Sequence, residues 1–516
     1  MAIETEGDVL AFLMSDPGLG KGAADAKVIT THISTVLLIG PRAFKLKRRV
    51  HLPYVDFSTA GKRLAACEQE LRLNRRTAPG LYRALRRVTR EPDGRLALDG
   101  AGPLVDAVVE MARFDEDGLF DRMALAGALT PALMTSLARR IAAFHADAAV
   151  DRRHGGAQAM AAVLDVNERG LTLTDVFSGE DVAALNAACR GALARHAALL
   201  DARARDGKVR RCHGDLHLRN ICLVDGVPTL FDCLEFDEAL ATTDILYDLA
   251  FVLMDLWHRG LEGLANTLFN RYLDETGEEA GLPLLPFFMA VRATVRAHVV
   301  AVQVDSAGAD AATRQAEARS YLGLARDCLK PCRPRLVAVG GLSGSGKSTV
   351  AAAVAPGIGP VPGARILASD RIRKRRFGVA AETRLPAEAY RSEVSAQVYE
   401  ALFDHAAGVL RSGHGVVVDA VFDRAPDRAR IEHVAAQAGA RFQGLWLEAG
   451  IETLMQRVAA RRDDPSDATP DVVREQAQRQ PAAVAWTHLA TEAGPDTVCR
   501  LARQALALRQ PSDSTA

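Results

Sequence analysis

The sequence predicts two parts of different fold class: an α+β part with two lobes, followed by an α/β part with a parallel sheet. The chain has 516 residues, which is too long for one ordinary hydrophobic core. Strand-like alternation dominates its beginning, and long helical patterns dominate residues 118–330. After the stretch KPCRPR at 330–335, strands and helices alternate, which is typical of a parallel sheet.

The α+β part, residues 1–329, is expected to contain a small strand-rich lobe at about 25–115 and a helical lobe at about 116–329. Alternating residues at 27–50, with Gly40 and Pro41 at the turn, predict a strand hairpin. A Ser/Thr cap opens a predicted helix at 58–76, and further strands are predicted at 82–98 and 104–114. The helices predicted for the second lobe lie at 130–148, 181–204, 243–258, 261–275 and 283–304, interrupted by a segment at 211–232 with two short strands.

The α/β part is predicted to span residues 336–505. Its strands are expected at 335–340, 364–368, 415–419 and 443–448, each followed by a helix. Residues 330–335 carry two prolines and no hydrophobic period, so they are interpreted as a linker, and residues 506–516 as a disordered tail.

Composition excludes several classes of protein. Hydrophobic residues make up 48% and charged residues 25%, and the formal net charge is +0, so no global charge favours nucleic acid or a membrane. The start MAIETEGDVL differs from a targeting peptide, and no run of 18 apolar residues predicts a membrane span. Eight cysteines without CxxC pairs fit reduced thiols, so a cytoplasmic location is expected.

The motif GGLSGSGKST at 340–349 contains the pattern G-x-x-x-x-G-K-S between a predicted strand and a predicted helix. Such glycines let backbone N–H groups surround phosphate oxygens; the lysine reaches the β- and γ-phosphates and the serine hydroxyl ligates Mg²⁺. The alternative is an ordinary glycine-rich turn. The predicted binding residues for ATP, with Mg²⁺ on Ser348, are Gly341, Ser343, Gly344, Ser345, Gly346, Lys347, Ser348 and Thr349.

Two acids follow predicted strands of the same part. Asp370, in ASDRIRKRRFG, faces the P-loop and is a candidate to take a proton from a substrate hydroxyl. Arg373 is a candidate to hold an anionic substrate or the transferred group. The alternative is a helix N-cap at Asp370 followed by a solvated basic face. Asp419 ends a buried strand, where a second acid near Mg²⁺ is expected.

A lid is predicted at 457–473, where a helix runs into a polar segment. Its Arg457, Arg461 and Arg462 are placed to close over ATP and neutralise developing charge. These features together resemble the small-molecule P-loop kinases, a group with gluconate kinases, zeta-toxin-like kinases and polynucleotide 5′-kinases, over residues 333–505. The resemblance implies phosphoryl transfer to a small metabolite. The basic run at 371–376 leaves a polynucleotide acceptor open, although it lacks interleaved aromatic residues.

The stretch HGDLHLRN in the helical lobe follows the pattern H-x-D-x-x-x-x-N. Asp215 is expected to orient and deprotonate an acceptor hydroxyl, and Asn220 to hold Mg²⁺. Twelve residues later, Asp232 ends a short strand and is a second candidate metal ligand. The alternatives are a zinc site, because His213 and His217 are four apart, and a structural turn with a buried Asp and His.

Residues 25–330 resemble the aminoglycoside-phosphotransferase-like kinases, which have a protein-kinase-like fold. The resemblance rests on HGDLHLRN and FDCLEFDEALATTDILYDLAFVLMDL. It implies that Lys45 pairs with nucleotide phosphates and with an acid on the next helix. Glu70 is preferred over Glu68, and Lys47 remains an alternative to Lys45. It further implies that VVEMARF is the hinge that meets adenine, near Glu110 and Met111, and that Asp244 and Asp248 brace the catalytic loop.

One feature departs from the kinase pattern: no G-x-G-x-x-G precedes Lys45, so side chains are expected to grip the phosphates. The whole arrangement resembles uncharacterised bacterial two-domain proteins that are predicted kinases. It implies a bifunctional ATP-dependent phosphotransferase that acts on small hydroxylated molecules and does not bind a membrane. Two alternatives remain. In one, the first half is a nucleotide-binding regulator of a single P-loop kinase; in the other, the second half is an ATPase without an acceptor. The sequence leaves both acceptors and the oligomeric state open.

Overall fold

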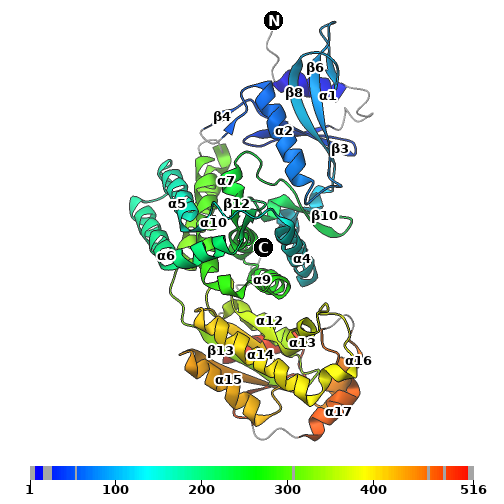
Figure 1. Cartoon of the computed structure of the whole chain (residues 1–516), viewed down its shortest axis with the longest axis vertical. Coiled ribbons are helices and arrows are strands. Elements are labelled where there is room, and N and C mark those ends of the chain that lie inside the picture. Colours follow the sequence, from blue (N-terminus) through cyan, green and yellow to red (C-terminus); the bar gives the residue numbers. More distant parts are fainter. Residues whose placement is uncertain are drawn as a thin grey trace. The chain divides into compact units, whose positions relative to one another are not determined.

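The computed structural model describes residues 6–15, 26–52, 55–304, 308–461, 465–479 and 484–508. The chain divides into two compact units (Figure 1). The first unit comprises Met1–Val163 and Ala197–Val252, and the second comprises Leu164–His196 and Leu253–Ala516. Three helices pass from one unit to the other: α5 (Gly156–Thr172), α6 (Gly179–Arg205) and α8 (Ile245–His258). The expected linker at 330–335 lies within the second unit, where residues 331–334 form neither helix nor strand.

The first unit contains a six-stranded antiparallel sheet in the order β1-β2-β3-β8-β6-β7. Its strands are β1 (Lys27–Thr30), β2 (Ser34–Ile39), β3 (Arg42–Lys47), β6 (Tyr82–Arg90), β7 (Leu96–Leu98) and β8 (Leu104–Ala112). A two-residue turn joins β2 to β3 at Gly40, whose φ of +50° lies in the left-handed region that suits glycine. The predicted hairpin is therefore confirmed.

A helix covers each face of this sheet. On one face α2 (Ala60–Asn74) packs Cys67 against Ala107 and Val109 of β8. Thr59 caps α2, because its side chain accepts a hydrogen bond from the Lys62 N–H at 3.3 Å, as the sequence predicts. On the other face α1 (Glu6–Ser15), for which the sequence analysis predicts no helix, buries two apolar side chains in the second core of the sheet.

The rest of the first unit is mainly helical, and three two-stranded sheets join its segments. The helices are α3 (Phe120–Leu125), α4 (Pro131–Asp147) and α7 (Glu238–Ala241), with 3-10 turns η3 (Glu116–Gly118) and η4 (Leu218–Asn220). The sheets pair β4 (His51–Leu52) with β5 (Val55–Asp56), β9 (Val209–Arg211) with β12 (Thr242–Asp244), and β10 (Ile221–Val224) with β11 (Val227–Leu230). The last pair contains the two short strands predicted at 211–232.

The second unit contains a five-stranded, all-parallel sheet in the order β14-β15-β13-β16-β17. Its strands are β13 (Arg335–Gly341), β14 (Arg365–Ala368), β15 (Val416–Asp419), β16 (Arg441–Glu448) and β17 (Thr487–Ala490). The four predicted strands are present, and β17 adds a fifth. The parallel α/β class is thereby confirmed, as is the α+β class of the preceding residues.

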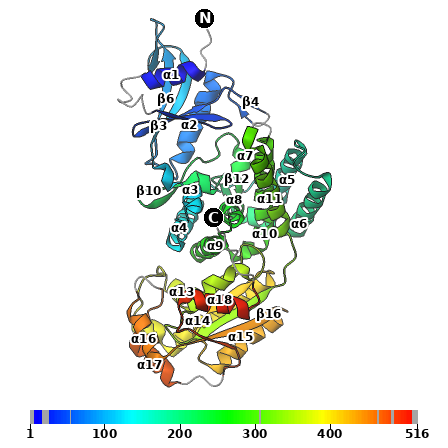
Figure 2. The same cartoon turned by 180° about the vertical axis from the view of Figure 1, so that it is seen from behind.

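Helices cover both faces of the parallel sheet. One face carries α14 (Ser392–Arg411) and α15 (Ala425–Gln437) (Figure 1). The other carries α12 (Lys347–Val354) and α18 (Pro495–Ala505), the latter labelled in Figure 2. Their valines and alanines pack on Val337, Val339 and Val417. The remaining elements of this part are α13 (Ser369–Arg376), α16 (Ile451–Ala459), α17 (Pro470–Gln478), η7 (Ala355–Gly357) and η8 (Ala387–Tyr390).

The second unit also holds the last helices of the preceding α+β part. These are α9 (Glu262–Thr276), η5 (Glu278–Leu284), α10 (Leu285–Val302), η6 (Gly308–Asp310) and α11 (Ala311–Cys328). Among the described residues, the stretch Glu278–Val302 is long and apolar enough to cross a membrane. Its most apolar window is 67% buried within the protein, which is typical of a helix at the centre of a core.

Candidate active sites

The P-loop connects β13 to α12 in the second unit, as its sequence predicts. Gly341, Gly344 and Gly346 have φ values of +136°, +88° and +92°, a region that side chains rarely adopt. A Cβ at Gly341 would lie 2.5 Å from the carbonyl oxygen of Leu447, and one at Gly344 would lie 2.6 Å from that of Leu454. The loop therefore needs glycine at both positions, for backbone conformation and for close packing against β16 and α16.

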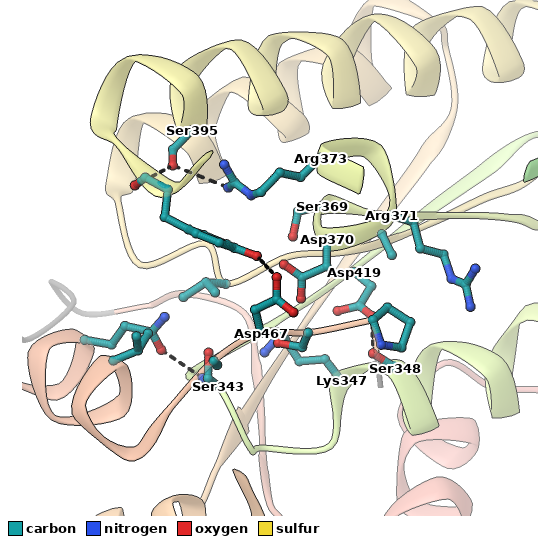
Figure 3. A pocket seen from close by; sticks show the side chains of 18 of the residues that line it. Ser343, Lys347, Ser348, Ser369, Asp370, Arg371, Arg373, Ser395, Asp419 and Asp467 are labelled. Atoms are coloured by element: carbon teal, nitrogen blue, oxygen red, sulfur yellow. Dashed lines mark hydrogen bonds between the residues drawn. The ribbon is translucent and has the colours of Figure 1, made fainter. Parts of the chain in front are cut away.

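Lys347 and Ser348 begin α12 directly after the loop. Lys347 Nζ donates a hydrogen bond to the carbonyl oxygen of Leu342 at 3.0 Å, across the loop that would enclose phosphates. Ser348 Oγ donates to Oδ2 of Asp419 at 2.6 Å, at the end of the neighbouring strand β15. A hydroxyl and a carboxylate oxygen in contact are ligands that suit Mg²⁺. The predicted metal ligands of this part are thus brought together (Figure 3).

Asp370 lies in the first turn of α13, and its carboxyl group is directed toward those of Asp419 and Asp467 in Figure 3. Burial raises the pKa of Asp370 above its ordinary value, and the Asp419 carboxylate adds to the rise, against a hydrogen bond with Ser466. A carboxylate with a raised pKa is a better proton acceptor. The alternative of an N-cap is wrong, because Ala368 occupies the N-cap of α13.

Arg373 and Lys374 are 6% and 1% exposed, so the alternative of a solvated basic face is also wrong for these two residues. The Arg373 guanidinium donates to Ala389 O at 2.6 Å and to Ser395 Oγ at 3.3 Å, and it stacks over the Tyr390 ring. These contacts fix Arg373 at the wall of the cavity.

The predicted lid at 457–473 begins in α16 and ends in α17, and these two helices share a small core of Leu454, Val458 and Val473. Arg457 and Arg461 both line the cavity, and Arg457 is held by Thr491 at 2.5 Å. Gln476 of α17 reaches the P-loop, where its Oε1 accepts a hydrogen bond from the Ser343 N–H at 2.9 Å. Arg462 lies outside the described residues.

The candidate site residues of this part line one cavity of about 1050 Å³. It is lined by most of the predicted P-loop residues together with Asp370, Arg373, Asp419, Arg457 and Arg461. Tyr390, Asp467 and Gln476 also line the cavity and were not predicted from the sequence. Asp467 accepts hydrogen bonds from Lys374 and Tyr390, both at 2.5 Å, from positions 93 and 77 residues away. No local pattern carries such long-range pairs.

The second candidate site lies in the first unit around the HGDLHLRN loop. Asn220 Nδ2 donates to both the backbone oxygen and Oδ2 of Asp215, each at 2.9 Å. Its amide oxygen is the atom available to a metal. Asp232 follows β11 with a φ of +62°, a strained value for a non-glycine residue, and its N–H donates to the Tyr82 hydroxyl at 3.2 Å. An amide oxygen and a carboxylate again suit Mg²⁺.

The buried carboxylate of Asp248 holds the HGDLHLRN loop. It accepts the N–H of His213 at 3.2 Å and that of Gly214 at 2.8 Å, and His145 Nε2 lies 3.1 Å away. Although His145, Cys212 and Asp248 lie within metal-ligand spacing of one another, Asp248 is engaged by the loop backbone. His213 Nε2 contacts Phe231 O at 2.9 Å, which argues against the zinc alternative. Asp244 forms a buried ion pair with Arg203 at 2.7 Å.

Both candidate lysines of β3 bind the same acid. Lys45 and Lys47 lie 2.8 and 2.7 Å from the two carboxylate oxygens of Glu70. Lys45 also contacts Asp232 at 2.5 Å, whereas Lys47 pairs with Glu235. Burial alone would lower the pKa of Lys45, yet Asp232 and Glu70 raise it well above its ordinary value. Lys45 is therefore the lysine that lies beside Asp232, the candidate metal ligand. Glu235, the partner of Lys47, was not predicted from the sequence.

The assignment of Glu110 and Met111 to the adenine hinge needs correction. Both lie within β8, and their backbones pair with β3 on one side and β6 on the other. The Glu110 carboxylate binds Arg86 at 2.7 Å. Their backbone groups are consequently used by the sheet. A hinge has to begin after Ala112, where β8 ends.

Comparisons with known proteins match both parts of the chain. The model of the phosphotransferase enzyme family matches residues 55–284, and the model of an AAA domain matches residues 336–484. An uncharacterised protein of Mycobacterium tuberculosis (strain ATCC 25618 / H37Rv) is 30% identical over 483 residues, which is 90% of this chain and 94% of the relative. An uncharacterised protein of Mycobacterium bovis gives the same values.

Two solved structures are similar to separate parts of the chain. A choline/ethanolamine kinase family protein from Mesorhizobium loti is 15% identical, with a TM-score of 0.38, and covers 62% of this chain and 98% of its own. A gluconokinase from Sinorhizobium meliloti 1021 is 20% identical, with a TM-score of 0.26, and covers 34% of this chain and 92% of its own.

Proposed function

The chain belongs to the same family as its mycobacterial relatives, and its two kinase-type domains make it a phosphotransferase; we propose that it is bifunctional. Each domain transfers the γ-phosphoryl group of ATP to a hydroxyl of a small molecule. The observation that carries this proposal is the convergence of Lys347, Ser348, Asp370 and Asp419 on one cavity. A catalytic loop with Asp215, Asn220 and Asp232 in the other unit supports a second site.

In the P-loop cavity, Asp370 accepts the proton of the acceptor hydroxyl. The acceptor oxygen forms a bond to the γ-phosphorus, the bond from that phosphorus to the β,γ-bridging oxygen breaks, and ADP leaves with the bonding electrons. Lys347 and the loop N–H groups bind the phosphates, while Arg373, Arg457 and Arg461 neutralise charge on the transferred group. Mg²⁺ held by Ser348 and Asp419 would supply further neutralisation of the phosphate oxygens.

In the first unit, Asp215 accepts the proton of its own acceptor. The hydrogen bond from Asn220 and the contact of His217 Nε2 at 3.4 Å orient its carboxylate. Asn220 and Asp232 would hold Mg²⁺, and Lys45 moves from Asp232 to the nucleotide phosphates while it keeps its ion pair with Glu70. Six buried cysteines, all free thiols, are consistent with a cytoplasmic location for this work.

A second candidate function makes the first unit a nucleotide-binding regulator of a single P-loop kinase. It is favoured by the turn between β2 and β3, which has two residues and no glycine-rich phosphate loop. The intact set of Asp215, Asn220 and Asp232 speaks against it.

The experiment that separates the two candidates follows labelled γ-phosphate from ATP into a pool of cellular metabolites. Wild type is compared with Asp215→Ala and Lys347→Ala. Bifunctionality predicts that each variant loses a different product. If Lys347→Ala loses every product and Asp215→Ala changes only a rate, the first unit is a regulator.

A further inference from the structure

Helix α9 is attached to the edge strand of the parallel sheet by two buried asparagines. Asn270 Oδ1 accepts a hydrogen bond from the Ile366 N–H of β14 at 2.7 Å, and its Nδ2 donates to Ala364 O at 3.1 Å. Asn266 Nδ2 donates to Pro362 O at 2.9 Å. Asn266 and Asn270 are 1% and 0% exposed. Because these bonds satisfy backbone groups that no strand pairs, they fix the position of α9 beside β14.

One turn farther along α9, Asp274 gathers three arginines. Its Oδ1 lies 2.7 Å from Arg365 Nη1, and its Oδ2 lies 2.8 Å from Arg271 Nη1 and 3.4 Å from Arg371 Nη1. Burial would raise the pKa of Asp274, but Arg365 and Arg271 lower it below its ordinary value, so the carboxylate stays charged. Arg365 has a second acidic partner, Glu279, at 3.1 Å.

Arg271 and Arg371 differ from Arg365 because both line the P-loop cavity. Within the part of the chain that the structure describes, Asp274 is the acidic partner that these two share. With Arg365 and Glu279 included, the ion pairs of this cluster join three guanidinium groups to two carboxylates, which leaves an excess of one positive charge in the cluster. Such an excess in a partly buried place is stabilised by an anionic ligand.

The place of this wall in the cavity indicates which ligand it faces. Asp370 and Arg371 both line the cavity from the first turn of α13, and Asp370 is the group that has to meet the acceptor hydroxyl. The nucleotide phosphates have a binding site of their own in the P-loop with Lys347. An anion at Arg271 and Arg371 is therefore part of the acceptor rather than of ATP.

We infer that Arg271, which α9 supplies from outside the P-loop domain, completes the acceptor site of that domain by binding an anionic oxyacid group together with Arg371. The inference rests on the proposed function and adds to it a specificity residue from the other half of the sequence. Asp274 is a positioning residue that aims the two guanidinium groups into the cavity. Without α9, Arg371 would be the one arginine of this pair left to bind the anionic group of the acceptor.

The test uses inorganic sulfate as the probe and the full chain loaded with Mg²⁺ and the non-hydrolysable ATP analogue AMPPNP, so that the P-loop is filled. Sulfate binding is measured by calorimetry for wild type, Arg271→Gln, Arg271→Lys and Arg326→Gln. Arg326 is the matched control, since it forms an exposed ion pair with Asp181 at 2.5 Å on α11 and does not line the cavity.

Loss of one charge-assisted contact predicts that Arg271→Gln weakens sulfate binding about tenfold or more, whereas Arg326→Gln leaves it unchanged. Arg271→Lys keeps the charge beside Asp274, so it preserves the fold, yet it weakens binding because it loses the planar fork. Equal sulfate affinity in wild type and both Arg271 variants would overturn the inference. It would also be overturned if the wild type did not bind sulfate at all. Failure of AMPPNP to bind in a Lys347-dependent way would instead count against the proposed function.

Discussion

Ser348 and Asp419 lie 71 positions apart in the sequence, yet the Ser348 hydroxyl donates a 2.6 Å hydrogen bond to the Asp419 carboxylate. Ser348 lies in α12 after β13, and Asp419 is the last residue of β15; the carboxyl ends of these neighbouring parallel strands meet at one edge of the sheet. This contact brings the two predicted metal ligands of the P-loop domain together beside Lys347. Each of the following predictions tests a comparable relationship.

Replacing Asp419 by Asn should reduce Mg²⁺-dependent turnover at the P-loop site without unfolding the protein. Asparagine keeps the size of the side chain and accepts the Ser348 hydrogen bond, but it removes the negative charge that favours the metal. Turnover by this site should fall about 100-fold or more, because enzymes lose about this much rate when a group that stabilises transition-state charge is removed. Mg²⁺ titrations of the rate in Asp419→Asn and Asp419→Glu check the prediction; an unchanged Mg²⁺ dependence would remove Asp419 from the metal site.

Asp370→Asn should abolish transfer at the P-loop site and increase stability at neutral pH. The pKa of Asp370 is raised by burial and by Asp419, so the folded state binds its proton more tightly than the unfolded state does. The contribution of Asp370 to the free energy of unfolding is therefore fully present below the ordinary aspartate pKa. It is lost as the pH rises through the raised pKa of the folded state. At neutral pH the buried, ionised Asp370 carboxylate destabilises the folded protein. The neutral amide in Asp370→Asn removes the free-energy cost of burying this charge.

Thermal unfolding at several pH values tests whether ionised Asp370 destabilises the folded protein. The Tm difference between Asp370→Asn and wild type should grow from acid to neutral pH. The wild-type rate at this site should also decline on the acid side through a pKa above the ordinary aspartate value, because only ionised Asp370 accepts a proton. A variant that is less stable than wild type at neutral pH would contradict the burial of a charged carboxylate here.

Lys47→Met should destabilise the first unit more than Lys45→Met does. The Lys47 side chain is 0% exposed and lies between Glu70 and Glu235, so its removal leaves buried carboxylates without a cation. Breaking a buried ion pair in this way costs about 3–5 kcal/mol. Lys45 is 11% exposed, and its partner Asp232 is 37% exposed and reaches water. Urea unfolding measures both variants.

The double variant Lys47→Met/Glu235→Gln provides the control for this prediction. Because it removes a charge from each side of the pair, it should regain part of the stability that Lys47→Met loses. Equal loss in the two single lysine variants would mean that Lys47 is not the structural member of the pair.

Asn270→Ala should lower the stability of the second unit by about 1–3 kcal/mol, because it leaves the Ile366 N–H unpaired in a buried place and removes one of the two hydrogen bonds to Ala364 O. Thr267→Ala on the same helix is the matched control, since the Thr267 hydroxyl donates a hydrogen bond to Gly263 O within α9 at 2.9 Å. Denaturant unfolding should separate the two variants. Similar stabilities would show that α9 is not fixed to β14 through Asn270.

Motifs and periodicity predicted most of the fold and the centres of both sites, for physical reasons. The P-loop, the capped helix α2 and the buried strands of the parallel sheet are local structures, and their residues lie within a few positions of one another. The pairing of Lys47 with Glu235 spans 188 residues, and the Asn270 bonds to β14 span 94 and 96. Such contacts depend on tertiary packing, so no window of the sequence predicts them.

The misplaced hinge has a similar cause. The run VVEMARF indicates a buried strand and its exit, but periodicity does not locate the residue at which pairing with the neighbouring strands stops. In the structure Glu110 still pairs with Phe44 and Ala84. Helix α1 was missed because ten residues are too few for a helix that is stable by itself, and tertiary contact with the sheet stabilises it.

The most direct test of two transfer sites on one chain uses the matched pair Asp215→Asn and Asp370→Asn, which remove one candidate base each and leave both nucleotide-binding loops intact. Labelled γ-phosphate is followed into products after AMPPNP binding has been confirmed for both variants. Two independent sites predict that each variant loses one product completely and forms the other at the wild-type rate. Loss of all products in either variant would contradict the account, because it would leave a single site of transfer.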